Sequence, residues 1–214
     1  MLYIDTETYS ECELKKCGGY RYAQDPTTCV TLFGYAIDDA PATTGTEMPQ
    51  DLSDALDDDN HLVLAHNSMF DRPVIEHTLN IKLPMHRWRD SMVKAYTLGL
   101  PGSLAQLGQA LGLSDDQAKM SDGHKLVMKF CKPAPINHKA FKYDKTTHPA
   151  EWERFIEYCG QDVEAMRTIW KLMPDINDLD HEIDLWHLDQ EINDRGMPID
   201  LDTVAIAIEH VAKE

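Results

Sequence analysis

The sequence predicts an α/β fold, with strands mostly in the first third of the chain and helices in the rest. Two apolar runs that are rich in β-branched and aromatic residues, Leu2–Ile4 and Cys29–Ile37, predict buried strands. Apolar residues recur at helical spacing over Glu151–Met173, which predicts a long amphipathic helix. We therefore expect a mixed sheet of about five strands flanked by helices.

Shorter patterns predict the remaining elements. In chain order they are a strand near Ala42–Met48, an acidic helix at Gln50–Asp59, a buried strand at Leu62–Ala65, and helices at Ser68–Leu79, Met92–Leu98 and Leu104–Leu111. Asp90 or Ser91 is expected to cap the helix at Met92, and Ser103 the helix at Leu104.

A domain boundary is predicted at Pro174, which ends the long helix. Residues 1–174 form the first domain, and 175–214 form a helical extension whose last helix begins near Asp200 or Asp202. The apolar face of that last helix needs a partner surface. We therefore expect the chain to be cut from a longer protein.

Composition excludes several classes of protein. The 214 residues carry 20 basic and 37 acidic side chains, a formal charge of −17, which argues against nucleic-acid binding through bulk positive charge. No apolar run is long enough to span a membrane and the first residues lack a signal-peptide pattern, so we expect an intracellular protein without a membrane partner. Five scattered cysteines predict reduced thiols, with Cys29 and Cys159 in the core.

One segment is basic. Residues 119–145 contain seven lysines and two aspartates, with Phe130, Phe141 and Tyr143 among them. Lysines interleaved with aromatic residues suit contacts with phosphates and bases, so we expect nucleic-acid contacts here. The alternative is an ordinary solvated loop.

Asp5 and Glu7 are the first candidate site residues. They lie two apart at the end of the predicted first strand, so both side chains point to the same face. Such carboxylate pairs suit Mg²⁺ or Mn²⁺, which prefer hard oxygen ligands. The alternative is that the two carboxylates are exposed surface at a strand end, which is common. The pair alone does not distinguish a metal site from such a surface.

Two further pairs are each four residues apart, and so lie on one face of a helix. Asn67 and Asp71 open the helix after the buried strand, where a carboxylate gains from the helix dipole; the alternative is that they only cap this helix. Tyr158 and Asp162 lie at the margin of the apolar stripe of the long helix, so a half-buried Asp162 needs a partner such as a metal ion. The alternative is a hydrogen-bonded Tyr–Asp pair.

Together, the Asp-x-Glu, Asn-x-x-x-Asp and Tyr-x-x-x-Asp patterns resemble the three exonuclease motifs of the DEDD superfamily, in its tyrosine subtype (DEDDy). Their spacing, with Arg89–Met92 and Ser103-Leu104, looks like the proofreading 3′–5′ exonuclease domain of phage-type family A (DNA polymerase I-like) DNA polymerases. The turn at Arg195–Asp200 looks like the start of the polymerase region. The resemblance implies an RNase H-like fold and, as a partner, a polymerase domain that these 214 residues lack.

The resemblance also implies roles for single residues. It implies removal of nucleoside monophosphates from single-stranded DNA 3′ ends, as the proofreading step of DNA replication, with two Mg²⁺ or Mn²⁺ ions held by Asp5, Glu7, Asp71 and Asp162. It implies that Tyr158 orients the attacking water and is not a base. Substrate contacts are expected from Thr6, Asn67, Phe70, Lys125, Lys129, Lys132, Lys139 and Lys142.

One position departs from the family pattern. Family members often place an apolar residue shortly after the first Asp to wedge against the terminal base, and here Glu11 stands there. Either Tyr9, Leu14 or Phe70 supplies the stacking, or the alignment shifts within that loop.

Other functions remain open. An RNA 3′-end-trimming ribonuclease of the same superfamily would lack the polymerase-like extension 175–214. A non-catalytic nucleic-acid-binding domain would not need all four carboxylates and Tyr158. An acidic scaffold would use the carboxylates only as surface. For the exonuclease, we expect a monomer in the cytoplasm of a bacterium or of a phage-infected host cell.

Overall fold

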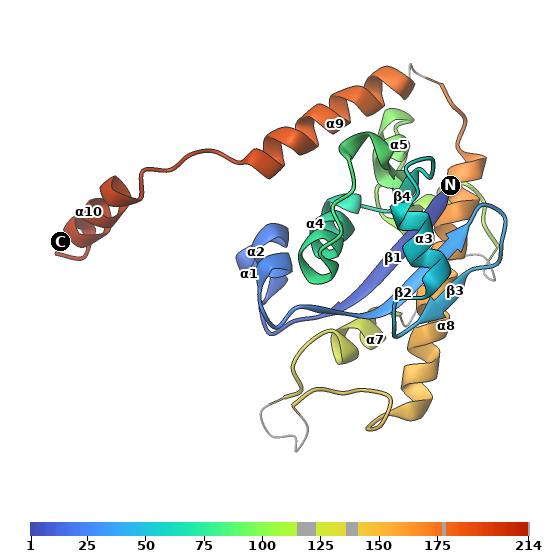
Figure 1. Cartoon of the computed structure of the whole chain (residues 1–214), viewed down its shortest axis with the longest axis horizontal. Helices are drawn as coiled ribbons and strands as arrows, with labels where there is room; N and C mark the ends of the chain where they lie inside the picture. Colours follow the sequence, from blue (N-terminus) through green and yellow to red (C-terminus); the bar gives the residue numbers. More distant parts are fainter. Residues whose placement is uncertain (115–122, 136–140, 177–178, 214) are drawn as a thin grey trace.

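A five-stranded mixed sheet forms the centre of the protein, as the sequence predicts (Figure 1). The computed structural model describes residues 1–114, 123–135, 141–176 and 179–213. The strand order is β3-β2-β1-β4-β5, with antiparallel pairing among β1, β2 and β3 and parallel pairing of β4 with β1 and β5. The strands are β1 (Leu2–Tyr9), β2 (Cys29–Ile37), β3 (Thr43–Gly45), β4 (Val63–Ala65) and β5 (Trp88–Asp90).

Ten helices and one 3₁₀ turn lie in the described residues. They are α1 (Leu14–Cys17), α2 (Gly19–Gln24), α3 (Gln50–Asp57), α4 (Ser68–Leu79), α5 (Ser91–Thr97), α6 (Leu104–Ala110), α7 (Gly123–Phe130), α8 (Pro149–Leu172), α9 (Leu179–Arg195) and α10 (Leu201–Val211), with a 3₁₀ turn η1 at Met85–Arg87. The sequence predicts α4 to the residue and α8 to within two residues at its start and one at its end. It misses β5, α1, α2 and α7, all of which are short.

The two faces of β1 carry different partners because side chains alternate along a strand. Leu2 and Ile4 pack in an apolar cluster with residues of α3 and α4. Tyr3 packs on the opposite face in a cluster with residues of α6 and α8. Asp5 and Glu7 therefore lie on the α8 face, and Thr6 lies on the α4 face.

Helix α8 approaches the sheet closely at one glycine. Gly34 of β2 pairs with Asp5 of β1. A Cβ atom at Gly34 would lie 2.7 Å from Sγ of Cys159 and 3.1 Å from its carbonyl oxygen. Because glycine has no side chain, the middle of α8 can contact the sheet next to Asp5.

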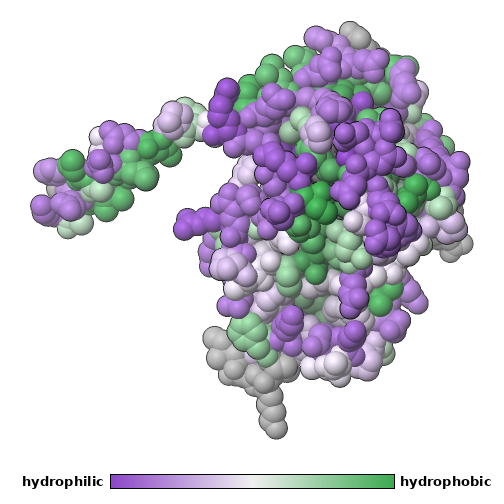
Figure 2. Space-filling view, viewed as in Figure 1, coloured by the Kyte–Doolittle hydropathy of each residue, from purple (hydrophilic) through white to green (hydrophobic). Residues whose placement is uncertain are grey.

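The C-terminal extension differs from the rest of the fold. Helix α9 contacts the body, whereas α10 has no buried residue and projects away from it (Figure 1). Apolar side chains of α10, including Ile206 and Ile208, lie on this projecting arm (Figure 2). The described residues contain no helix that is long and apolar enough to cross a membrane.

One expectation about the core is wrong. Cys159 is fully buried as predicted, but Cys29 is exposed, because it is the first residue of β2 and lies at the end of the sheet. The described chain has no disulfide among its five cysteines.

Candidate active site

Asp5 and Glu7 lie inside β1 and not at its end. The strand continues to Tyr9 because it pairs with β2 as far as Cys29, and Thr6, Glu7 and Thr8 are buried there although they are polar. Glu7 is 8% exposed and Asp5 is half-buried. The predicted shared face is correct, but the site is deeper in the fold than the sequence suggests.

Asp71 reaches the same strand from its edge. Strand β4 pairs with β1 only at Leu2 and Tyr3, so the edge of β1 beyond them is open to α4. There, Oδ1 of Asp71 accepts hydrogen bonds from the backbone N–H of Thr6 at 3.1 Å and from its hydroxyl at 2.6 Å. Burial, and to a smaller extent the charge of Asp90, raise the pKa of Asp71 to about 7, although the hydrogen bonds from Thr6 lower it.

Asp90 holds the start of α4, a role that the sequence does not reveal. Its carboxylate caps α5 by accepting from Met92 N–H, as predicted, and also accepts from the backbone N–H groups of Asn67 and Ser68. Asn67 has a φ of 65°, and its own side chain makes no capping hydrogen bond within the described residues. Asp90 and not Asn67 therefore caps α4, and the exposed Asn67 faces a groove described below.

Tyr158 and Asp162 lie together on the buried face of α8. Both are at most 5% exposed, and the Tyr158 hydroxyl donates to the Asp162 carboxylate. Burial, and then the negative charges of Asp162 and Glu7, raise the pKa of Tyr158 far above its usual value of 10.0. Tyr158 is therefore a phenol at neutral pH, and it can orient a water or a carboxylate but cannot act as a base.

Helix α7 determines the position of the Tyr158 ring. A Cβ atom at Gly123 would lie 2.1 Å from this ring, so only a glycine fits there. The ring also stacks on Phe155 with a centroid distance of 6.3 Å.

Contacts between the elements bring the carboxylates into one region: Asp71 of α4 binds Thr6, which lies between Asp5 and Glu7, and Gly34, the partner of Asp5, lies against the buried thiol of Cys159 on α8. Burial is the main reason why the pKa of this thiol is well above 9.0. The charges that raise it further are, in order, those of Asp5, Glu7, Asp162 and Asp71. β1, α4 and α8, the elements that carry the three motifs, thus meet in this region.

The chemical type of the four candidate ligands suits a hard divalent cation. All four groups are carboxylates, the ligand type that Mg²⁺ and Mn²⁺ prefer. No group of three or more His, Cys, Asp or Glu side chains among the described residues is arranged to hold one metal ion.

Two grooves lie beside the carboxylates. One of about 150 Å³ has Glu7, Tyr22, Cys131 and Lys132 in its wall, and the other of about 210 Å³ has Tyr20 and Asn67. Leu14 and Phe70 line both grooves. Of the three stacking candidates these two are therefore accessible, whereas Tyr9 is buried. Glu11 is exposed.

The basic segment reaches the site through Lys132, which lines the groove with Glu7. Lys125 is exposed on α7, and Nζ of Lys129 binds Oε1 of Glu151 at 2.5 Å, which joins α7 to α8. Lys142 lies over the ring of Tyr9. Lys119 and Lys139 lie outside the described residues.

Cys131 is a site residue that the sequence patterns do not reveal. Its buried thiol donates to Oε2 of Glu7 at 3.6 Å, across 124 residues of chain. Burial and the charge of Glu7 raise its pKa well above 9.0, so it stays a protonated donor.

A family model described as RNase_H superfamily matches residues 2–174. The chain belongs to the RNase H superfamily. This RNase H-superfamily protein is 39% identical over 215 residues to a DNA polymerase of Bacillus phage SP02, in an alignment that covers 97% of the chain but 33% of the polymerase. It therefore spans about a third of that relative. A solved structure described as the apo form of the nuclease has the same fold, with a TM-score of 0.56, 16% sequence identity, and coverage of 89% of this chain and 79% of the other.

Proposed function

We propose that this RNase H-superfamily domain is a 3′–5′ exonuclease that acts on single-stranded DNA ends, as the proofreading part of a DNA polymerase. The observation that supports the proposal is that the three motifs lie on elements that meet: Asp71 of α4 binds Thr6, between Asp5 and Glu7 of β1, and α8 with Tyr158 and Asp162 lies against Gly34, the partner of Asp5. The similarity to a phage DNA polymerase supports DNA as the substrate and a polymerase region as the partner. The same similarity supports a location in the cytoplasm of a bacterium or of a phage-infected host cell.

Two divalent ions, Mg²⁺ or Mn²⁺, would be held by these four carboxylates. When bound, such ions activate a water and stabilise the leaving oxygen of a phosphodiester. Because a carboxylate has two oxygens, Asp71 can accept both hydrogen bonds from Thr6 at Oδ1 and still bind a cation.

The other residues position the substrate. Leu14 and Phe70 separate the two grooves, so an apolar contact from them can stack against the last bases of a single strand. Lys132, in the groove wall beside Glu7, is suited to pair with a backbone phosphate. The phenol of Tyr158 donates a hydrogen bond to Asp162 and so fixes the direction of this carboxylate.

Digestion of a 5′-labelled single-stranded DNA oligonucleotide tests this function. With Mg²⁺ or Mn²⁺ we expect a ladder that shortens from the 3′ end, and no digestion in EDTA. Asp162→Asn should abolish the ladder, whereas Glu157→Gln on the exposed side of α8 should not. A ladder that Asp162→Asn leaves intact would contradict the proposed centre.

The same assay separates the alternatives. Faster digestion of a matched RNA oligonucleotide would support a ribonuclease. Tight binding of the DNA with no digestion by either metal would support a non-catalytic binding domain.

A further inference from the structure

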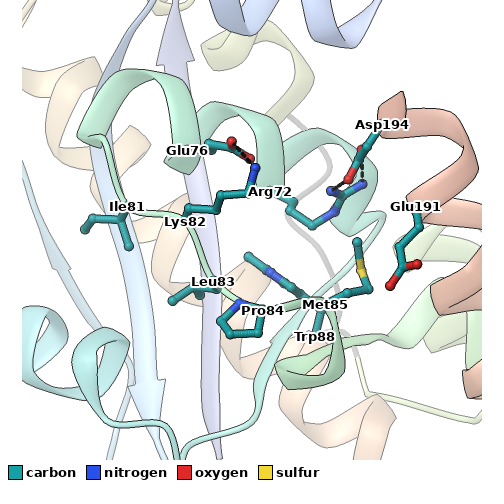
Figure 3. Close-up of a pocket in the computed structure, with 10 residues that line it drawn as sticks. All are labelled: Arg72, Glu76, Ile81, Lys82, Leu83, Pro84, Met85, Trp88, Glu191 and Asp194. Carbon is teal, nitrogen blue, oxygen red and sulfur yellow. Dashed lines mark hydrogen bonds and ion pairs between the residues drawn. The ribbon is translucent and has the colours of Figure 1, made fainter. Parts of the chain in front are cut away.

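Arg72 follows Asp71 on α4 and is directed to a different element. Its guanidinium is buried and forms a fork on the Asp194 carboxylate of α9, with distances of 2.5 Å from Nη1 to Oδ2 and 2.9 Å from Nη2 to Oδ1 (Figure 3). Nη2 also donates to Oε1 of the buried Gln190 at 3.0 Å. A bidentate pair of this kind fixes the direction of both side chains as well as their distance.

Asp194 also binds the wall of a groove. Its Oδ1 accepts the hydroxyl of Tyr20 at 2.5 Å. Tyr20 lies on α2 and lines the groove of about 210 Å³ together with Asn67 and Phe70 of the α4 region. One carboxylate of the extension therefore ties α2 and α4 together where they form a groove at the candidate site.

The first turn of α4 is thus held from three directions. Thr6 of β1 holds it through Asp71, and Asp90 holds it through the backbone of Ser68. The third hold is Arg72 on α9, which follows the predicted domain boundary. Of the three, this hold is the one that joins α4 directly to the extension.

We propose that Arg72 is a positioning residue that makes α9 part of the exonuclease centre. Through Asp194 and Tyr20 it fixes the first turn of α4, and with it Asp71 and Phe70, relative to Asp5 and Glu7. This inference rests on the proposed function, and it assigns to residues 179–195 a role beyond that of a connection to the polymerase region.

The extension contains a matched control. Lys94 of α5 forms an ion pair with Asp175 and is as deeply buried as Arg72, but it lies on another helix. Asp175→Asn and Asp194→Asn therefore remove the same charge from the same extension, and only the second acts on α4.

Hydrogen exchange tests the contacts of Arg72 with Asp194, here called the clamp, and does not require the protein to be active. In the full chain without metal, Asp194→Asn should make the amides of the first two turns of α4 exchange about tenfold faster, because their opening costs less. Asp175→Asn should leave them unchanged. Arg72→Lys keeps the charge but loses the fork, so it should give the same result as Asp194→Asn and serves if that variant fails to fold.

Kinetics test the positioning role. Asp194→Asn should lower kcat for single-stranded DNA digestion by about tenfold, the range seen when a support of a metal ligand is lost. Its melting temperature should stay near that of Asp175→Asn, whose kcat should equal that of the wild type.

Each outcome decides the proposal. Unchanged exchange in α4, or changed exchange with an unchanged kcat, would overturn it. An equal loss of kcat in Asp175→Asn would also overturn it, because the effect would then be a general loosening of the extension. If the wild type digests nothing, the proposed function fails, and hydrogen exchange alone decides whether the clamp exists.

Discussion

Replacing Asp71 by Asn should stabilise the metal-free protein at neutral pH, although it removes a proposed metal ligand. Burial raises the pKa of this carboxyl to about 7, the Thr6 hydrogen bonds oppose the rise, and the charge of Asp90 adds to it. Asparagine is neutral at every pH and keeps an oxygen that can accept the two hydrogen bonds from Thr6. The substitution therefore removes the cost of burying a charge while it preserves the local contacts.

The size of the effect follows from the two pKa values of Asp71. The folded protein holds this proton more tightly than the unfolded chain, whose pKa is near 3.8. The stability that the protonated side chain contributes is complete below 3.8 and is lost as the pH rises through about 7. At about 1.4 kcal/mol for each pKa unit, the ionised carboxylate costs at most about 4 kcal/mol above that pH.

Urea unfolding in EDTA at acidic and alkaline pH tests the reasoning. At a pH of about 8, Asp71→Asn should exceed the wild type by about 2–4 kcal/mol in free energy of unfolding, and at about 4 by less than about 1 kcal/mol. Asp57→Asn, at an exposed position of α3, should change neither value. Equal stabilities at the higher pH, or an equal gain at both, would refute the link between burial and the raised pKa.

Three other outcomes are expected. Mg²⁺ or Mn²⁺ at about 100 times its Kd should stabilise the wild type by about 2.7 kcal/mol in calorimetry, because cations relieve carboxylate repulsion, and should not stabilise Asp162→Asn. Gly34→Ala should cost about 1–3 kcal/mol of unfolding free energy, because its methyl group would lie 2.7 Å from Sγ of Cys159; Gly45→Ala, with its nearest neighbour at 3.4 Å, should cost less. Tyr158→Phe should lower kcat for DNA digestion, and the wild-type pH profile should show no phenol ionisation up to a pH of about 10, because burial and Asp162 raise the pKa of Tyr158.

The candidate site could be predicted because each of its motifs is local in sequence. Asp5 and Glu7 share a face of the strand whatever its exact last residue is, because side chains alternate. A spacing of four residues places Tyr158 and Asp162 on the same face of a helix. The start of α4 could be predicted because an apolar strand leads directly into it; in the structure Asn80, with a φ of 56°, ends the helix.

The missing parts depend on contacts between distant segments. Strand β1 continues through polar residues to Tyr9 because it pairs there with β2, and the alternation of apolar residues cannot reveal this pairing. Strand β5 is only three residues long and exists as the parallel partner of β4. The bond between Cys131 and Glu7 spans 124 residues, and the fork between Arg72 and Asp194 spans 122. Such pairs follow from the topology of the sheet and not from local spacing.

These distant contacts explain how carboxylates can be held near one another at the candidate site. Three of them have a neutral donor of their own: Thr6 donates to Asp71, Tyr158 to Asp162 and Cys131 to Glu7. Hydrogen bonds to an ionised carboxylate lower the cost of its charge, so the fold tolerates the mutual repulsion. Hydrogen-bond partners of this kind also fix the direction of a carboxylate, and each carboxylate has a second oxygen with which it can bind a cation. We therefore expect the loss of such a donor to weaken cation binding, because the carboxylate that it orients would then be free to rotate.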